Sequence, residues 1–551
     1  MLMCNTFIKI ISVIILIIAF LVNALGHFFG IGDIIPTGCL TTTEVSTEVE
    51  PTTGILPTEP TSATEPTSPE TTSATVASTT TTTVPATTTT TSPATTTTTA
   101  PTTTTTRATT KPTTTEEGPF VDSAEPVSFS ILGGNRDDIF KGVAQTSDGG
   151  FVACGISSST TGNLDGKYSG DWQAPYSFVA KFDKDGNIKW LKGIGSSTGG
   201  IVLEDIAVLS SGSIVAVGYS KATEYAPNTV SSGTTNAIAL KISTYTGKVT
   251  LQKGFGGSQA DMFYCVDATE NGFVVGGKAH SNDGSFEGLP GSSAIIMNFD
   301  SDYNVLWNKY LHGEKGASIE DISVDTSGNI FAACLTSSTT GEFAAFEELM
   351  GKNTDSVILK YNSDGNYQWG HVIATSGIDE FASVAADNKG GCLVGGQYEL
   401  MTTVSPDGTL EGIHNCGGID AVLVRLNNEG ERRWVKVISG IDDDFITGIS
   451  ATTGGFAVSG YTASANRDFS SIGNMGDYDG FTCFVSNSGA TIRMFSQAGS
   501  GEDSATAVAC SDSGRVMVVG KSTSTDSVFT KDESVYGAYT GYVSVYSVTA
   551  S

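Results

Sequence analysis

The sequence predicts an all-β fold, a seven-bladed β-propeller of four-stranded blades that its N-terminal strand closes. Three observations predict it. A glycine step recurs about every 60 residues, each repeat holds four short apolar runs divided by turn residues, and the two ends of the array complement each other. The steps lie at Gly134, Gly200, Gly257, Gly313, Gly377, Gly440 and Gly501.

The third repeat shows the unit most clearly. Its four apolar runs are residues 261–266, 272–276, 294–300 and 305–310, and Gly, Asp and Asn between them supply the backbone angles of tight hairpins. A tryptophan recurs in the fourth run, where a large ring can fill the space between two blades. These tryptophans are Trp190, Trp307, Trp369 and Trp434.

The ends of the array predict that the ring is closed. Residues 127–132 have the pattern of a fourth strand, but no first three strands precede them. Residues 508–510, 516–519 and 542–545 supply three strands, after which the sequence stops. Pairing these segments completes a seventh blade and leaves no open sheet edge.

Residues 1–36 are predicted to be a signal or anchor helix. Lys9 precedes an apolar run from Ile10 to Val22, and a less hydrophobic stretch continues to Phe29. A cleavable secretory signal with a site at residues 22–24 is one interpretation, and a transmembrane anchor is the other. We favour the anchor, because the apolar stretch outlasts a typical signal core. The early lysine then places the rest of the chain outside the cell, so we expect a membrane-anchored cell-surface protein, with a secreted protein as the alternative.

Residues 37–118 are almost entirely Thr, Pro, Ala, Ser and Glu. This composition offers too little apolar surface to fold, and we expect a disordered, extended Thr/Pro-rich stalk that is a candidate for O-glycosylation. The propeller is predicted to occupy residues 119–551 as a single domain, and we expect a monomer.

The net charge limits the classes of binding partner, and the positions of the cysteines indicate whether they form disulfides. The net charge of −29 repels phosphate backbones, so we expect no nucleic acid partner. Most of the nine cysteines lie in apolar strand patterns and are interpreted as small buried hydrophobic residues rather than a disulfide framework.

Strand parity places all the long loops on one face. In an antiparallel four-stranded blade, the connection between blades and the loop from the second to the third strand emerge on the same side, here called the loop face. The two tight hairpins emerge on the opposite side, the hairpin face. Variable loops on a rigid frame are where binding usually resides. Tyr168 and Trp172 in the first long loop could stack on a sugar ring or anchor a protein.

Acidic residues recur in the connections between blades. Asp138, Asp261, Asp379 and Asp503 share one register, while Asp443–Asp444 and the pairs at 204–205 and 320–321 are predicted to be displaced by a few residues. One interpretation is an acidic rim that binds cations or sugar hydroxyls; the other is that each carboxylate accepts backbone N–H groups in its own turn. The candidate ligand-binding residues are Asp138, Asp261, Asp379, Asp444, Asp503, Trp172 and Tyr168.

No catalytic or metal-binding pattern stands out. The five histidines lack ligand spacing, and no glycine-flanked nucleophile is found. Calcium at the turns with Asp183 and Asp300 is a possibility, but ordinary hairpin aspartates explain them better. We therefore expect no cofactor.

The repeats resemble those of secreted bacterial β-propeller repeat proteins. The shared string is a glycine pair, an acid, Asp-Gly-Gly, an apolar strand ending Lys-Phe-Asp, and then Gly and Trp. The hairpin at residues 185–190 is also weakly similar to the blade motif of quinone-binding propellers. The resemblance implies blades rather than chemistry. We expect a cell-surface binding or adhesion module for a protein or glycan, with an extracellular polysaccharide-acting enzyme using rim carboxylates as the alternative.

Overall fold

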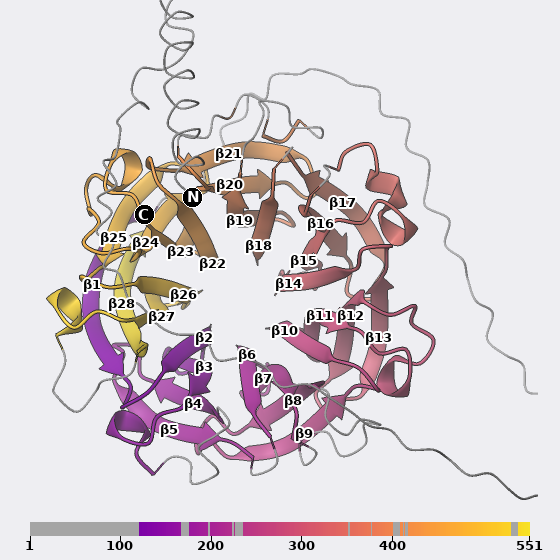
Figure 1. Cartoon of the computed structure of the whole chain (residues 1–551), viewed down its shortest axis with the longest axis horizontal. Coiled ribbons are helices and arrows are strands. Elements are labelled where there is room, and N and C mark those ends of the chain that lie inside the picture. The colour runs from indigo at the N-terminus through magenta and orange to yellow at the C-terminus, as the bar shows by residue number, and fades with distance from the viewer. Residues whose placement is uncertain are drawn as a thin grey trace, which may run out of the picture. The chain divides into compact units, whose positions relative to one another are not determined.

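The computed structural model contains seven four-stranded antiparallel sheets arranged around a central axis (Figure 1). It describes residues 121–551 apart from 167–175, 197–198, 223–224, 226–234, 351–352, 376, 400–407, 411–412, 414–416, 531–537 and 551. The predicted seven-bladed propeller is confirmed. The predicted N-terminal helix and stalk lie outside the described residues, and within them no helix is long and apolar enough to cross a membrane.

The first four blades each follow the chain from the innermost to the outermost strand. Blade 1 consists of β2 (Asp138–Gln145), β3 (Phe151–Ser157), β4 (Tyr176–Phe182) and β5 (Ile188–Ile194). Blade 2 consists of β6 (Ile201–Val208), β7 (Ile214–Ser220), β8 (Asn236–Ile242) and β9 (Val249–Phe255). Blade 3 consists of β10 (Asp261–Ala268), β11 (Gly272–Ala279), β12 (Ser293–Asp300) and β13 (Val305–Leu311). Blade 4 consists of β14 (Ala317–Val324), β15 (Ile330–Thr336), β16 (Asp355–Tyr361) and β17 (Tyr367–Ile373).

The last three blades complete the ring. Blade 5 consists of β18 (Asp379–Ala386), β19 (Cys392–Tyr398), β20 (Asp420–Leu426) and β21 (Arg432–Ile438). Blade 6 consists of β22 (Asp444–Thr452), β23 (Gly455–Thr462), β24 (Asp479–Ser486) and β25 (Thr491–Gln497). Blade 7 consists of β26 (Asp503–Cys510), β27 (Arg515–Ser522), β28 (Thr540–Ala550) and β1 (Val121–Leu132).

Blade 7 is built from both ends of the folded region, as predicted. β1 pairs antiparallel with β28, with Leu132 opposite Gly541 and Ser123 opposite Thr549. The two strands lie side by side on the left of Figure 1, in indigo and yellow. The strand begins at Val121, several residues before the predicted start, so the closing ladder is longer than the apolar pattern alone indicated.

The hydrophobic core lies between blades. One cluster joins Val152 and Val179 of blade 1 to Ile206 and Ile238 of blade 2, and corresponding clusters fill the other junctions. The predicted buried cysteines are confirmed at five positions, and Cys510 is partly exposed. The buried ones are Cys154, Cys265, Cys334, Cys392 and Cys483. Because each apolar face is covered only by the next blade, no blade can bury its core alone.

The predicted tryptophans join neighbouring blades on the hairpin face. Each indole Nε1–H donates to a carbonyl in the last hairpin of the following blade. The pairs are Trp190 with Thr244 (2.9 Å), Trp307 with Ser363 (3.1 Å), Trp369 with Asn428 (2.8 Å) and Trp434 with Asn487 (2.9 Å). A ring and a hydrogen bond thus fix the angle between successive blades.

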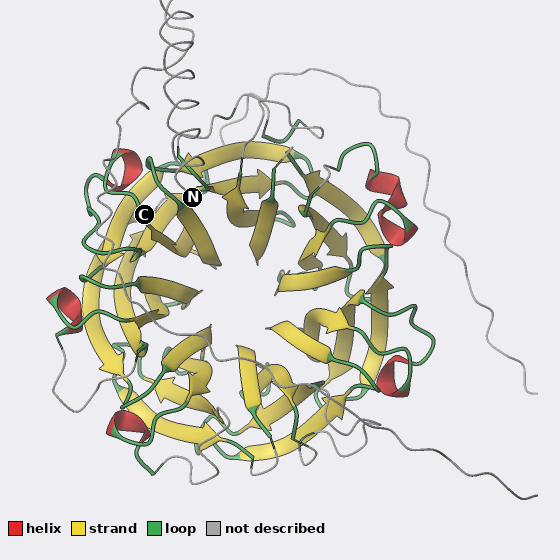
Figure 2. Cartoon of the chain, in the orientation of Figure 1, coloured by secondary structure: helices red, strands yellow, loops and turns green. Residues whose placement is uncertain are grey.

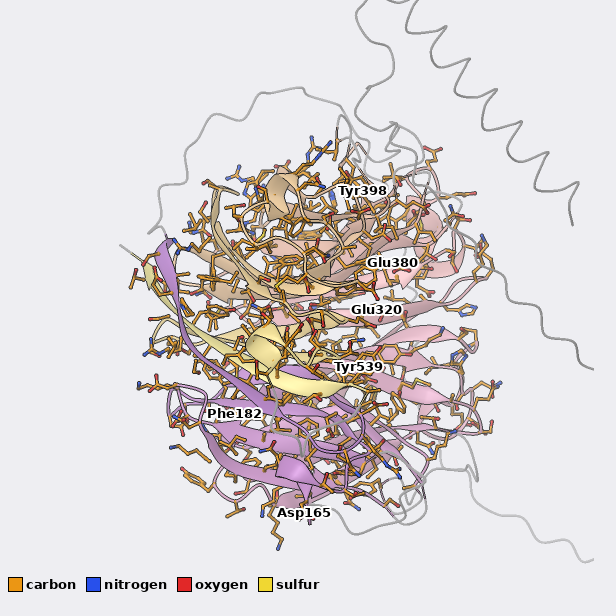
Figure 3. All side chains as sticks on the ribbon, turned by 60° about the vertical axis from the view of Figure 1, so that its left-hand side comes forward. Asp165, Phe182, Glu320, Glu380, Tyr398 and Tyr539 are labelled. Atoms are coloured by element: carbon orange, nitrogen blue, oxygen red, sulfur yellow. The ribbon has the colours of Figure 1, made fainter. Side chains whose placement is uncertain are left out.

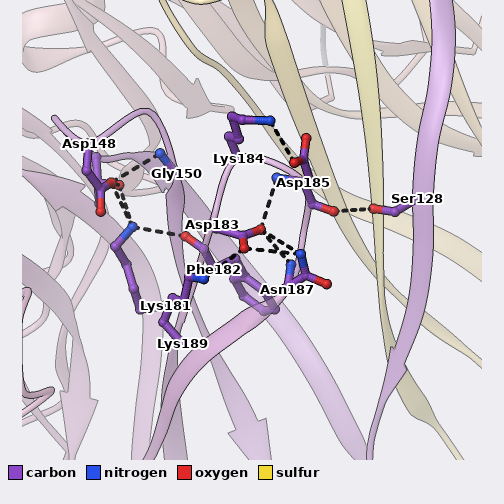
Figure 4. A network of polar contacts seen from close by, with 11 residues as sticks. Ser128, Asp148, Gly150, Lys181, Phe182, Asp183, Lys184, Asp185, Asn187 and Lys189 are labelled. Atoms are coloured by element: carbon purple, nitrogen blue, oxygen red, sulfur yellow. Dashed lines mark hydrogen bonds and ion pairs between the residues drawn. The ribbon is translucent and has the colours of Figure 1, made fainter.

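The junction between blades 7 and 1 has no tryptophan and uses polar contacts instead. Ser128 of β1 occupies the strand position of the tryptophans, and its hydroxyl donates to the Asp185 carbonyl at 2.6 Å (Figure 4). Arg515, which like Ser128 belongs to blade 7, contacts the Asp185 carboxylate at 3.2 Å. The closing junction therefore also has a hydrogen bond to the last hairpin of the next blade, donated by a hydroxyl instead of an indole.

Among the described residues, the loop from the second to the third strand carries a short 3₁₀ helix in five blades. These helices are η2 (Gly162–Leu164), η3 (Gly284–Phe286), η4 (Gly341–Phe346), η5 (Arg467–Phe469) and η6 (Ser527–Phe529), drawn in red in Figure 2. Each loop is tied to the preceding connection between blades, as by Asn163 N–H donating to the Gly133 carbonyl at 3.0 Å. The two kinds of loop therefore share one face, as strand parity predicts.

Gly430 provides a test of the tryptophan junction. It has a φ of 80°, and a Cβ added there would meet the Trp369 ring at 2.6 Å. Gly149 has a φ of 79° but nothing within 4 Å of such a Cβ. We expect Gly149→Ala to lower the free energy of unfolding by roughly 1–2 kcal/mol through backbone strain. Gly430→Ala should lower it by about 1–3 kcal/mol more, because the added methyl group overpacks against the indole. Thermal unfolding followed by circular dichroism measures the difference, and equal losses would contradict this account of the junction.

Candidate functional site

The five predicted rim aspartates are enclosed in their own turns. Asp138, Asp261, Asp379, Asp444 and Asp503 begin the innermost strands and are all 0% exposed. One oxygen accepts the N–H four residues upstream, as from Gly134 to Asp138 (2.8 Å) and from Gly440 to Asp444 (2.7 Å). Serine or threonine hydroxyls add to this, as Ser157 of the second strand does at 2.5 Å to Asp138.

This arrangement gives the rim aspartates the turn-holding role that was one of the two interpretations. Their contact with a ligand stays a prediction, and it would require the turn to open. The register differs from the prediction in one respect: Asp444 occupies the same position as Asp138 rather than a displaced one. The residue before it, Asp443, is partly exposed, because it lies in the connection outside the strand.

The other candidate positions have different outcomes. Trp172 and Tyr168 lie outside the described residues. The hairpin aspartates Asp183 and Asp300 each accept two backbone N–H groups in their own turns, as from Asn187 (2.9 Å) and Asn304 (2.9 Å). The described residues contain no group of three or more His, Cys, Asp or Glu side chains placed to hold a metal ion. Calcium binding at these turns was the less favoured alternative, and it stays untested.

The innermost strands surround a central channel with a cavity of about 410 Å³. Its wall is held together by carboxylates that reach from one blade to the next. Asp205 accepts the N–H of Val266 (2.8 Å), and Asp267 that of Val324 (2.7 Å). Asp321 of blade 4 likewise accepts the N–H of Val384 in blade 5 (2.8 Å). These carboxylates replace direct backbone pairing between blades, so their role is architectural.

Burial makes these channel carboxylates poor acids. It raises the pKa of Asp321 to about 7 and that of Asp267 to about 6, although backbone N–H donors oppose the shift. Burial raises the pKa of Asp444 to about 7 in the same way. Part of the formal negative charge of the propeller is therefore neutralised near neutral pH.

The channel opens on the loop face through a ring of side chains from the first two strands of each blade. Lys141 of blade 1 pairs with Glu204 of blade 2 at 3.0 Å. Glu380, labelled with Glu320 in Figure 3, accepts a hydrogen bond from the Gln397 amide at 3.0 Å. We call this ring, which includes Lys141, Glu204, Glu380 and Gln397, the channel mouth. Its partly exposed charged and aromatic groups differ from blade to blade.

Blades 6 and 7 bring aromatic rings to the channel mouth. Phe445, Tyr461 and Tyr478 contact one another in blade 6, with centroids 4.6 Å apart for Phe445 and Tyr461 and 5.4 Å for Tyr461 and Tyr478. Tyr539 in blade 7 contacts Lys521 and Glu502. Tyr478 and Tyr539 lie in long loops of the kind expected from the sequence to bind a partner, whereas nothing in the sequence alone indicated that Phe445 and Tyr461 lie beside them.

Comparisons with known proteins add little to this geometry. No protein family matches the chain. A segment is 28% identical over 162 residues to an uncharacterized WD repeat-containing protein of Acanthamoeba polyphaga mimivirus, and the match covers 27% of this chain and 12% of that protein.

Solved structures are similar only at a low level. BamB from Moraxella catarrhalis has a TM-score of 0.36 at 12% identity, and the match covers 77% of this chain and 100% of that one. The Neurospora crassa Pan2 WD40 domain has a TM-score of 0.39 at 7% identity, with coverage of 77% and 96%. Quinohemoprotein alcohol dehydrogenase from Comamonas testosteroni has a TM-score of 0.35 at 10% identity, with coverage of 77% and 76%. The resemblance to secreted bacterial β-propeller repeat proteins and the weaker one to quinone-binding propellers stay predictions.

The buried carboxylates predict how stability depends on pH. The ordinary pKa of an aspartate is 3.8, and that of Asp321 in the folded protein is about 7. Its contribution to stability is therefore fully present below the unfolded pKa and is lost as the pH rises through about 7. We expect the midpoint temperature of thermal unfolding to decrease as the pH is raised from 5 to 8. The decrease should be smaller in Asp321→Asn. Asp364→Asn, which removes an exposed hairpin carboxylate, should keep the wild-type slope; an unchanged slope in Asp321→Asn would contradict the prediction.

Proposed function

We propose that this protein is a binding module that recognises a partner protein through the loop face of its propeller. The observation that carries this proposal is a contrast between the two faces. A residue that recurs in every blade is explained by what every blade needs, whereas positions that vary on a constant backbone are available for recognition.

The hairpin face repeats one set of interactions. Indole rings, or Ser128 at the closing junction, bond to the last hairpin of the next blade. Aspartates or asparagines accept backbone N–H groups within their own turns, as Asp300 and Asn362 do. Cations there are also used internally, since Lys181 forms an ion pair with Asp148 at 2.8 Å and donates to the Phe182 carbonyl (Figure 4). These polar groups of the hairpin face therefore serve the fold.

The loop face varies at constant positions. The position opposite the second residue of each innermost strand is occupied in turn by Ile156, Tyr219, Lys278, Leu335, Gln397, Tyr461 and Lys521. The residue before the third strand is Thr235, Ser292, Thr354, Ile419, Tyr478 or Tyr539 in blades 2 to 7. Apolar, aromatic, basic and uncharged polar groups thus occupy these positions without a repeating pattern.

Exposed apolar side chains add to this face. Ile378 and Ile441 lie in the connections that lead into blades 5 and 6, and each is exposed by more than two fifths, at 44% and 54%. Met475 and Val528 lie in the long loops of blades 6 and 7 and are exposed at 58% and 46%. Apolar groups beside acids, on loops that a closed ring holds rigid, are suited to a protein partner. The cell-surface location is part of the proposal and is supported by the N-terminal sequence alone.

Protein and glycan arrays probed with the full chain test this function. We expect binding to protein probes that falls about tenfold or more in Tyr478→Ala, because its ring lies at the channel mouth. Leu306→Ala, which removes an exposed side chain of the outermost strand of blade 3, should leave binding unchanged. Tyr168→Ala and Trp172→Ala test the first long loop. Binding to glycans alone, or equal losses in Tyr478→Ala and Leu306→Ala, would contradict the proposal.

A further inference from the structure

Blade 7 contains a complete site for a cation and fills it with its own lysine. Lys521 Nζ lies 2.9 Å from a Glu502 carboxylate oxygen and 4.4 Å from the centroid of the Tyr539 ring. The Tyr539 hydroxyl donates to the other Glu502 oxygen at 3.0 Å. An ammonium group is thus held between a carboxylate and the face of an aromatic ring, which is a favourable arrangement for a cation.

Blade 6 has an acid and a tyrosine at the same places but, within the described residues, no cation between them. Glu502 and Asp443 each precede the first residue of an innermost strand, and Tyr539 and Tyr478 each precede the first residue of a third strand. The Asp503 N–H donates to the Tyr478 carbonyl (2.7 Å), as the Asp138 N–H does to that of Tyr539 (3.0 Å). The acid and the tyrosine are therefore present in both blades at equivalent places.

The lysine is the part that differs. Lys521 lies opposite Ser504 in blade 7, and the equivalent pair in blade 6 is Tyr461 opposite Phe445. Blade 6 therefore has two extra rings where blade 7 has an ammonium group and a hydroxyl. In the described part of the chain, no lysine or arginine lies within ion-pair distance of Asp443.

The environment of these rings is acidic. Tyr461 and Tyr478 are partly exposed, as is Phe445. Burial, and after it the neighbouring Tyr478 ring and the charges of Glu502, Asp443 and Glu380, raise the pKa of Tyr461 to about 12. Burial and the charge of Asp443 also raise the pKa of Tyr478. Glu502 already has a cationic partner, whereas Asp443 has none among the described residues.

We propose that Phe445, Tyr461, Tyr478 and Asp443 form a binding site for an arginine side chain in a basic segment of the partner protein. The inference rests on the proposed function and names the chemistry of the partner. A planar guanidinium can stack on an exposed tyrosine ring and bond a carboxylate at the same time, and it is more weakly hydrated than an ammonium group. The partner supplies in blade 6 the cation that Lys521 supplies in blade 7.

A labelled peptide of alternating arginine and glycine tests the site in the full chain by fluorescence anisotropy. A second peptide carries citrulline, which has the shape of arginine without its charge. We expect the arginine peptide to bind about tenfold or more tightly than the citrulline peptide, as a charge held against a ring and a carboxylate requires. Equal binding of the two peptides would overturn the inference.

Variants then locate the site. Tyr461→Lys places an ammonium group where blade 7 has Lys521, so it should fill the site from within and reduce arginine-peptide affinity about tenfold. Tyr219→Lys is the matched control, since it adds the same charge at the equivalent position of blade 2, where Thr235 replaces the tyrosine; its affinity should stay close to that of the wild type. Equal losses in both variants would show only a general charge effect and would overturn the assignment.

Two further variants keep the test decisive. Asp443→Asn should also weaken the arginine peptide, and it remains informative if Tyr461→Lys fails to fold, which thermal unfolding checks. Lys521→Tyr should open the site of blade 7, so that peptide binding rises from one to two per chain. If the chain binds proteins on the array through Tyr478 but does not require arginine in them, the proposed function stands and this inference is refuted. If the wild-type chain binds no protein on the array, the proposed function itself is refuted.

Discussion

The pairing of β1 with β28 is the constraint on which the rest of the structure depends. It joins residues as far apart in the sequence as Ser123 and Thr549, whose hydroxyls lie 2.9 Å apart. Without it, blade 7 would lack its outermost strand, and blade 1 would lose the Ser128 contact with its hairpin. Because every apolar core is shared between neighbours, an open ring would expose two faces that nothing else covers.

Once the ring is closed, neighbouring blades are fixed at two radii. Indoles fix the outer part of four junctions on the hairpin face, and Asp205, Asp267 and Asp321 fix the wall of the channel at three. The outer contacts are a packed ring with one hydrogen bond, whereas the inner ones are buried carboxylates that accept backbone N–H groups. The inner contacts come with raised pKa values, since burial disfavours the charged form.

The two faces therefore divide the work of the molecule. The hairpin face and the channel wall use their polar groups internally, and repetition of the same contacts is what the closed ring needs. The loop face carries connections of unequal length, and the backbone there is held by enclosed aspartates such as Asp138 and Asp444. A rigid backbone with changing side chains is the physical basis for recognition at the channel mouth. Blades 6 and 7 illustrate it, since Tyr461 of blade 6 occupies the position of Lys521 in blade 7, and a ring instead of an ammonium group contacts the neighbouring tyrosine.

The amino-acid sequence by itself determined the number of blades, their four strands, the closing strand and the faces to which the loops belong. These follow from local turn residues, apolar runs and strand parity, all of which act over short distances in the chain. Only the tertiary structure decided that Asp138, Asp261, Asp379, Asp444 and Asp503 point into their own turns, because burial of a carboxylate depends on the second strand packed against it. Likewise, Phe445, Tyr461 and Tyr478 belong to three segments, and only the packing of two strands and a loop brings their rings into contact beside Asp443.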